Sequence, residues 1–127
     1  MNRYSLIVQG NLFFTKAAIK HQGRVRVVKL LIDCGASQTI LSWGALASLE
    51  IDPAISPIRR RIVTANGLVQ APEVTVEELH SLGQRVNQLP VLALTIPFGS
   101  QIAGVLGMNF LRRFDTDLNF KQATIRI

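Results

Sequence analysis

One stretch of the chain, LLIDCGASQTILS (residues 30–42), combines residue types that hydrolytic chemistry uses. A run of apolar residues ends at the carboxylate of Asp33, and the small residues Cys34, Gly35 and Ala36 follow at once. Burying an unpaired carboxylate is costly, so such a group has either hydrogen-bonding partners or a chemical task. A glycine allows the sharp turn that brings backbone amides near the carboxylate, and an alanine does not crowd a cleft. Asp33 is therefore the first catalytic candidate, with capping of its own turn as the structural alternative.

The elements that would position Asp33 are short strands separated by turns. Asn66-Gly67 predicts a hairpin turn because both residues adopt positive φ readily. A short helix is expected at residues 42–51 with Ser42 as its cap, and another at residues 107–114. The sequence thus predicts a small, closed all-β domain with one or two short helices. The expected strands are residues 5–14 (with a weak point at Gly10), 25–33, 58–63, 68–79, 89–96 and 123–127.

The composition is that of one globular domain, with 48% hydrophobic and 17% charged residues in 127. A single cysteine excludes an internal disulfide, which fits a reducing compartment. The first 14 residues lack the layout of a cleavable signal, because their apolar run is short and interrupted. The charge-free residues 86–111 contain two prolines and FGSQ (98–101), so two buried strands joined by a loop are expected rather than a membrane span. We expect one cytoplasmic domain, residues 1–127.

The charge balance raises nucleic acid as a partner, because 14 lysines and arginines face 8 acidic residues and give a net charge of +6. These basic residues are scattered, at 24–29, 59–61 and 112–113 among others, without aromatic residues placed for base stacking. A solvated basic surface that favours acidic partners is the simpler interpretation, and no nucleic-acid partner is expected. Cys34, His21 and His80 lack the spacing of a metal site, so neither a metal nor a cofactor is expected.

Two segments resemble a known protease family. IDCGASQTIL (residues 32–41) is similar to the active-site loop of retropepsin-like aspartic proteases, whose signature is two apolar residues, Asp, Thr or Ser, Gly and Ala. AGVLGMNFLRRFDTDLNFKQATIRI (103–127) resembles the closing segment of that family, a glycine stretch before a short helix and a final strand pair. The resemblance covers about residues 25–127 and points to bacterial single-domain members, which carry LGM-x-FL here. It implies a closed acid-protease barrel.

The resemblance also implies a mechanism, that of an aspartic endopeptidase acting on peptide or protein substrates. Two carboxylates share one proton and activate a water against the peptide bond. Two carboxylates ~3 Å apart repel by ~5 kcal/mol at an effective dielectric of ~20, so one stays protonated. The chain holds one Asp-x-Gly, and Asp115 and Asp117 lack a glycine turn. The second carboxylate must then be Asp33 of another protomer, so the mechanism requires a homodimer.

The family's flap hairpin corresponds to TANG, the residues Thr64, Ala65, Asn66 and Gly67. The resemblance implies that this tip closes over an extended peptide and supplies backbone hydrogen bonds. An ordinary hairpin turn is the alternative.

Cys34 departs from the family pattern, which has threonine or serine there to brace the two catalytic loops across the dimer axis. A thiol is a weaker hydrogen-bonding group, so a looser dimer and a weakened activity are expected. Oxidation of the two facing Cys34 thiols would link or block the dimer; a small buried side chain without such a role is the alternative. Met108 stands where retroviral members have an arginine, so that family's ion pair is not expected. Asn109 is expected to cap or brace the terminal helix.

Two other functions stay open. A dimeric module that binds peptides or proteins, with the protease fold but a decayed active site, is favoured by the replacement at Cys34. The intact Asp33, Gly35 and Ala36 oppose it. A cysteine hydrolase would use Cys34 with His21 or His80 as its base, but neither histidine lies in a recognisable motif.

Overall fold

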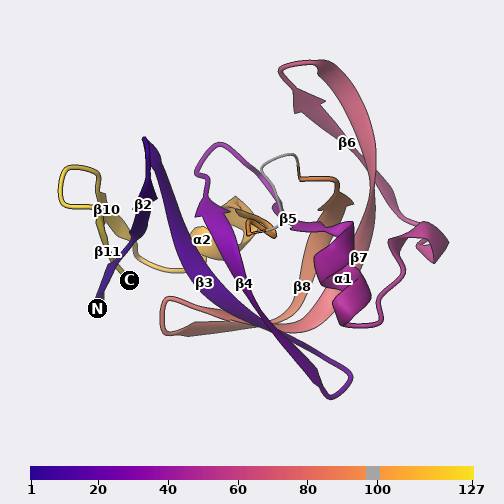
Figure 1. The fold of residues 1–127 in the computed structure, drawn as a ribbon, viewed down its shortest axis with the longest axis horizontal. Helices are drawn as coiled ribbons and strands as arrows, with labels where there is room; N and C mark the ends of the chain where they lie inside the picture. Colours follow the sequence, from indigo (N-terminus) through magenta and orange to yellow (C-terminus); the bar gives the residue numbers. More distant parts are fainter. Residues whose placement is uncertain (97–100) are drawn as a thin grey trace.

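Strands dominate the computed structural model, which describes residues 1–96 and 101–127 (Figure 1). The short helical segments are α1 (Trp43–Ser48), the 3₁₀ turn η1 (Pro53–Ile55) and α2 (Met108–Leu111). The predicted all-β class with short helices is confirmed. The strands are β1 (Arg3–Ser5), β2 (Ile7–Gln9), β3 (Leu12–His21), β4 (Arg24–Ile32), β5 (Thr39–Ser42), β6 (Arg59–Thr64), β7 (Gly67–Ser81), β8 (Gln84–Leu94), β9 (Gly104–Leu106), β10 (Asp117–Asn119) and β11 (Thr124–Arg126).

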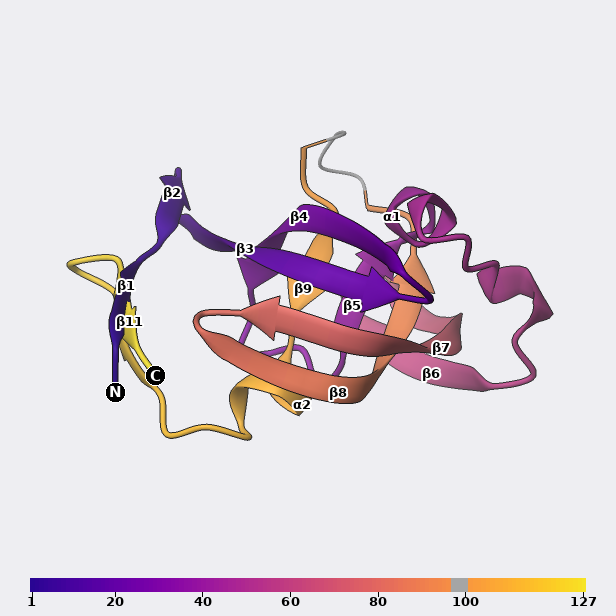
Figure 2. The same cartoon turned by 90° about the horizontal axis from the view of Figure 1, so that it is seen from below.

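The main sheet closes on itself. Its strand order is β2-β3-β4-β9-β5-β8-β7-β6, and β3 pairs with β7 in addition to β4. The strands β3, β4, β9, β5, β8 and β7 therefore form a hydrogen-bonded ring (Figure 2). This ring agrees with the closed β domain that the sequence predicts, and it leaves β6 outside, as the free arm of the β6–β7 hairpin.

The interior of the ring is filled by aliphatic side chains that alternate along its strands, as period-two patterning requires. Each fully buried leucine or isoleucine contributes ~1.5–3 kcal/mol relative to an exposed one. Helix α1 begins after Ser42, whose Oγ accepts a hydrogen bond from the Ala45 amide at 3.1 Å, which confirms the predicted cap. Core side chains with no exposed surface include Ile19, Leu30, Leu41, Leu46, Val76, Leu79, Leu89 and Phe110.

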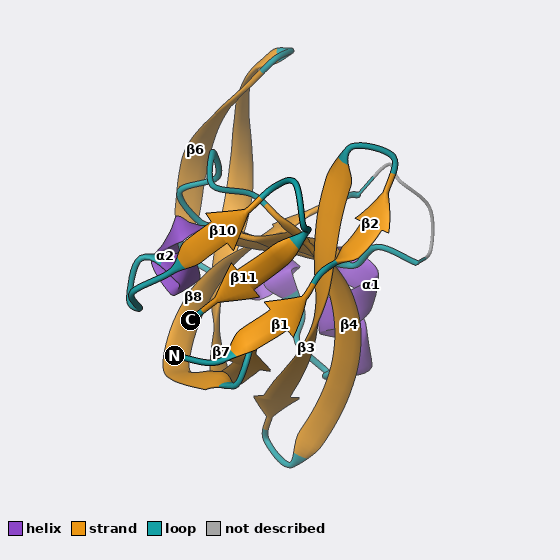
Figure 3. Ribbon diagram, turned by 90° about the vertical axis from the view of Figure 1, so that its left-hand side faces the viewer, coloured by secondary structure: helices purple, strands orange, loops and turns teal. Residues whose placement is uncertain are grey.

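Both ends of the chain meet in a second, three-stranded sheet with the order β1-β11-β10 (Figure 3). The amide of Asn2 donates to the carbonyl of Ile127 at 3.0 Å, and the amide of Ile127 donates back to Asn2 at 3.0 Å. Ile125 of β11 is buried in the same core as the ring. The terminal sheet is therefore packed onto the ring rather than detached from it.

Two turns differ from the prediction. Residues 5–14 do not form one strand, because the chain reverses at Gly10 and Asn11 so that β2 pairs with the start of β3. Gly10 has φ 60°, which glycine tolerates best. The β6–β7 hairpin turns at Ala65 and Asn66 and not at Asn66-Gly67, because Gly67, with φ 114°, already pairs with Thr64. The sequence predicts a reversal near Asn66-Gly67 but none at Gly10, and in both places the strand pairing fixes the register.

The charge-free residues 86–111 contain most of β8 together with β9, so the two predicted strands are confirmed. The predicted loop at FGSQ (98–101) lies, apart from Gln101, outside the described residues. Within the described part of the chain, every helix is too short or too polar to span a bilayer.

Candidate active site

Two neighbouring parallel strands bring the candidate loop and helix α2 together. Ile32, the last residue of β4, pairs in parallel with Leu106, the last residue of β9. Parallel strands end at the same edge of a sheet, so the segments after them emerge side by side. The amide of Asp33 donates to the Leu106 carbonyl at 3.2 Å, which holds the carboxylate at that edge.

The loop turns around the carboxylate of Asp33. The Gly35 amide donates to Asp33 Oδ1 at 2.9 Å, and the Ala36 amide donates to the Asp33 carbonyl at 3.2 Å. A Cβ at position 35 would lie 3.2 Å from the same Oδ1, so glycine allows this close approach. Asp33 thus caps its own turn through Oδ1. Its Oδ2 has no hydrogen-bond partner among the described residues, so it is available for chemistry.

Helix α2 begins against the loop. The amide of Met108 donates to the Ala36 carbonyl at 2.8 Å, and that of Asn109 donates to Ser37 at 3.1 Å. A Cβ at Gly107 would lie 2.5 Å from the Gln38 carbonyl oxygen, so only glycine permits this contact. The first helical amides, which have no partner within a helix, are satisfied by the loop and fix it in place.

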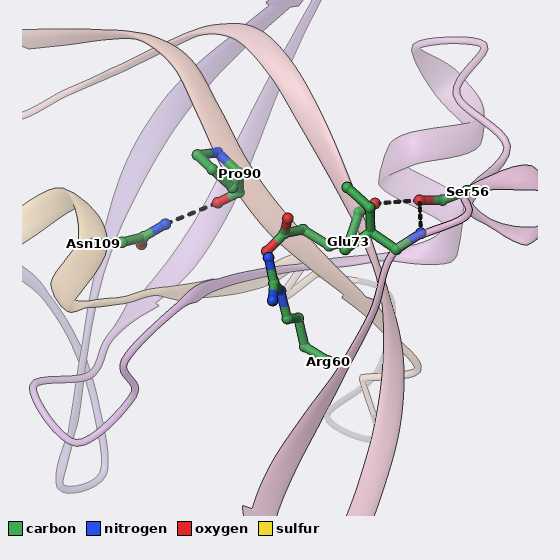
Figure 4. A network of polar contacts seen from close by, with 6 residues as sticks. Ser56, Arg60, Glu73, Pro90 and Asn109 are labelled. Atoms are coloured by element: carbon green, nitrogen blue, oxygen red, sulfur yellow. Dashed lines mark hydrogen bonds and ion pairs between the residues drawn. The ribbon is translucent and has the colours of Figure 1, made fainter.

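The side chain of Asn109 joins three elements, as its predicted bracing role requires. Its Oδ1 accepts hydrogen bonds from the amide and the hydroxyl of Thr39, both at 2.8 Å. Its Nδ2 donates to the Pro90 carbonyl of β8 at 2.8 Å (Figure 4). Thr39 is fully buried, and its Oγ1 also accepts from the Gly107 amide at 3.1 Å. This network ties the end of the loop that holds Asp33 to α2 and β8.

A groove of about 560 Å³ lies beside Asp33. The loop contributes residues 33 and 35–38 to its lining, and the outer strand β6 of the β6–β7 hairpin contributes residues 60–63. Among the described side chains, the lining from the hairpin comprises residues 60–63 and does not include the predicted tip residues Ala65, Asn66 and Gly67. Asp33 is the one carboxylate among the described residues that line the groove.

Cys34 faces a different space. It lines an apolar cavity of about 240 Å³ with Ile32, Met108 and Leu111, and the residue is exposed. The alternative that Cys34 is a small buried side chain is therefore wrong for this protomer. The loop presents Asp33 and Cys34 to separate cavities, whereas Gly35 and Ala36 line the groove with Asp33.

Neither histidine lines the groove or the cavity beside Cys34. His80 Nε2 instead lies 3.1 Å from Glu78 Oε2, and this hydrogen bond lowers the pKa of the Glu78 carboxyl. A cysteine hydrolase with His21 or His80 as its base gains no support from this arrangement. Among residues 1–96 and 101–127, no three His, Cys, Asp or Glu side chains gather as metal ligands do.

The contribution of β6 to the groove could not be predicted from the composition and local pattern of residues 60–63 alone. In the sequence, Arg60 and Arg61 fit a scattered basic surface, and Ile62 and Val63 fit an ordinary strand. The expected flap hairpin carried the missing signal, because the arm of a hairpin that covers a site must present side chains to it.

Comparisons with known proteins agree with this geometry. The family model for aspartyl proteases matches residues 17–110. Among solved structures, the chain is similar to a retropepsin-like aspartic protease from Rickettsia conorii, with 21% identity, coverage of 99% of both chains and a TM-score of 0.75. A search of curated proteins gives no significant match. Because the family model spans most of the sequence, including the loop at Asp33 and the start of α2, the chain belongs to the aspartyl protease family.

Proposed function

We propose that the protein is a homodimeric aspartic endopeptidase in which Asp33 of each protomer contributes one of two catalytic carboxylates. The observation that carries this proposal is the position of Asp33, which is the only carboxylate among the described residues that line a groove of about 560 Å³ and whose Oδ1 is held by the Gly35 amide. One protomer supplies only half of the acid–base pair, so the partner's Asp33 completes it.

In the proposed reaction, the ionised Asp33 takes a proton from a water, whose oxygen attacks the carbonyl carbon of the scissile peptide bond. The partner's Asp33, which is protonated, donates its proton to the carbonyl oxygen and gives a neutral tetrahedral intermediate. Transfer of a proton to the amide nitrogen then lets the C–N bond break. Because the two carboxylates share one proton, activity is expected in acidic solution and lost where that proton dissociates.

The substrate is proposed to lie extended between the active-site loop and β6. The hairpin tip, Thr64 to Gly67, closes over it from the free end of the β6–β7 arm, which projects from the body of the domain in Figure 1. An extended peptide can satisfy its backbone groups on a strand-like hairpin, which gives affinity without sequence preference.

Cleavage of a diverse peptide mixture tests the proposal. Wild-type protein, Asp33→Asn and Asp115→Asn are compared from roughly pH 3 to 7 at high concentration, with cut sites read by mass spectrometry. Asp115 is an exposed carboxylate outside the groove, so its variant controls for the chemical change. We expect equal cleavage by wild type and Asp115→Asn, and a loss of about 10³-fold or more in Asp33→Asn.

Cleavage by Asp33→Asn at the wild-type rate would overturn the proposal and point to another nucleophile. If none of the three proteins cleaved any peptide although a dimer was present in solution, the result would instead support a binding module. The replacement of the family's threonine or serine by Cys34 is the observation in favour of that second function.

Cys34→Thr is expected to tighten the dimer. A hydroxyl that hydrogen-bonds across the axis contributes about 1 kcal/mol per bond, so two symmetric bonds lower the dimer Kd by at least about tenfold. Activity per protomer in dilute solution should rise accordingly, while Cys34→Ala, which adds no hydroxyl, should not gain. Sedimentation of wild type, Cys34→Thr and Cys34→Ala over a dilution series measures the dimer Kd. An unchanged Kd for Cys34→Thr would contradict the expected hydrogen bond from residue 34 across the dimer axis.

A further inference from the structure

Three consecutive arginines, Arg59, Arg60 and Arg61, form the part of β6 nearest the body of the domain. Arg59 donates to backbone carbonyls of η1, from Nη1 to Pro53 at 3.4 Å and from Nη2 to Ala54 at 3.2 Å. Its guanidinium thus holds the base of the flap hairpin. Arg60 and Arg61, by contrast, line the groove beside Asp33.

Arg60 is fixed in orientation by a buried carboxylate. Arg60 pairs with Ala71 across the hairpin, and the diagonal neighbour on β7 is Glu73, whose side chain is 9% exposed. Arg60 Nε lies 3.1 Å from Glu73 Oε1 (Figure 4), and the Arg60 side chain remains 55% exposed. A buried carboxylate needs its partner, so Glu73 anchors the guanidinium at Nε. The Nη groups of Arg60 make no hydrogen bond to the described residues and stay available to a ligand.

Arg61 has a different environment. The residue is exposed, and its guanidinium makes no ion pair or hydrogen bond to another residue of the described chain. Two arginine residues, whose side chains leave opposite faces of β6, are thus among the lining residues of the groove, and Asp33 is the only acidic residue among its described lining residues. In the proposed mechanism Asp33 is occupied with the water and shares a proton with its partner, so it does not neutralise both arginines.

We propose that Arg60 and Arg61 make this groove selective for peptides that carry an aspartate or glutamate side chain close to the scissile bond. The inference rests on the proposed peptidase function and names its substrate class. A guanidinium forms short, paired, charge-assisted hydrogen bonds with a carboxylate, and an arginine already oriented loses less freedom on binding. Arg60 supplies the oriented group, and Arg61 adds a second cation one residue along the same strand.

Cut-site preferences of wild type, Arg61→Gln and Arg85→Gln in a diverse peptide mixture test the selectivity. Arg85 is an exposed arginine on β8, about 23 Å along that strand from the groove residue Leu92, and its loss changes the net charge equally. A synthetic pair from one cut peptide, with Glu or Gln at the selected position, then gives kcat/KM. We expect a preference of about tenfold for Glu in wild type and Arg85→Gln, and of about threefold or less in Arg61→Gln.

The contribution of Arg60 needs a paired change, because Arg60→Gln alone would leave Glu73 buried without its partner. The double variant with Arg60→Gln and Glu73→Gln removes both charges and leaves the net charge unchanged. It should reduce the Glu preference as Arg61→Gln does. An unchanged preference in both Arg61→Gln and the double variant would overturn the inference while leaving the peptidase intact.

A binding measurement separates failure of the inference from failure of the proposed function. Asp33→Asn protein is immobilised and challenged with the same peptide mixture, so that retention is measured without cleavage. Retained peptides should be enriched in acidic residues, the enrichment should weaken at high salt, and Arg61→Gln in the Asp33→Asn background should lower it. Retention without any acidic preference contradicts the inference whether or not the wild type cleaves peptides.

Discussion

An approximately ninefold excess of Asp33→Asn protomers is expected to reduce the peptidase activity of wild-type protein mixed with it. In a random mixture about one wild-type protomer in ten then meets another, so activity per wild-type protomer falls about tenfold. The physical reason is that a mixed dimer holds one carboxylate and one amide and cannot share a proton between them. The measurement is the initial rate against a fixed cut-site peptide after the protomers have exchanged in dilute solution.

The matched control for this mixture is the same excess of Asp115→Asn, which keeps the groove carboxylate and changes an exposed one. That excess should raise the total activity about tenfold, because every dimer stays competent. Wild-type activity that persists undiminished in excess Asp33→Asn would mean that one carboxylate suffices, and it would rule out the shared-proton mechanism.

Gly104→Ala is expected to destabilise the domain by about 3–5 kcal/mol, or to prevent it from folding. Gly104 has φ 156°, and a Cβ there would lie 1.8 Å from the Ile40 carbonyl oxygen and 3.1 Å from the Leu41 Cα. Both contacts are backbone atoms of β5, which cannot rotate away. The strand β9 is held between β4 and β5, so it has no freedom to shift either. Urea unfolding at one fixed protein concentration measures the change.

Gly44→Ala is the matched control for Gly104→Ala. Gly44 is an exposed residue of α1, and a Cβ there would meet nothing within 4 Å. Because alanine has a higher helix propensity than glycine, this variant should gain about 0.5–1 kcal/mol in the free energy of unfolding. If Gly104→Ala unfolded at the same urea concentration as the wild type, the close packing of β9 against β5 would be disproved.

Local features of the fold were predictable from the sequence because they depend on a few adjacent residues. Ser42 before an apolar helical run predicts a cap, and the run of apolar residues up to Asp33 predicts a strand that ends in a turn. The pairing of β3 with β7 and the placement of β9 between β4 and β5 are set by packing among distant segments. No short window of sequence encodes them.

The candidate site divides in the same way. Asp33, Gly35 and Ala36 could be named from the sequence because they are consecutive and their types suit the chemistry. The Thr39–Asn109 hydrogen bonds join residues 70 positions apart, so their pairing needed the fold. The roles of Arg59, Arg60 and Arg61 differ although the three residues are identical, because the neighbouring η1 carbonyls, Glu73 and the groove determine them.

The parallel pairing of β4 with β9 also sets when the loop around Asp33 can form. The partner of Ile32 is Leu106, and the amides that bind the loop carbonyls belong to Met108 and Asn109. At synthesis rates of about 5–20 residues per second, the ribosome needs roughly 4–15 s to reach them after it has passed Asp33. Until then the carboxylate is attached to a strand without its neighbour. The loop around Asp33 therefore acquires its hydrogen-bonding partners only after residues 106–109 have been synthesised.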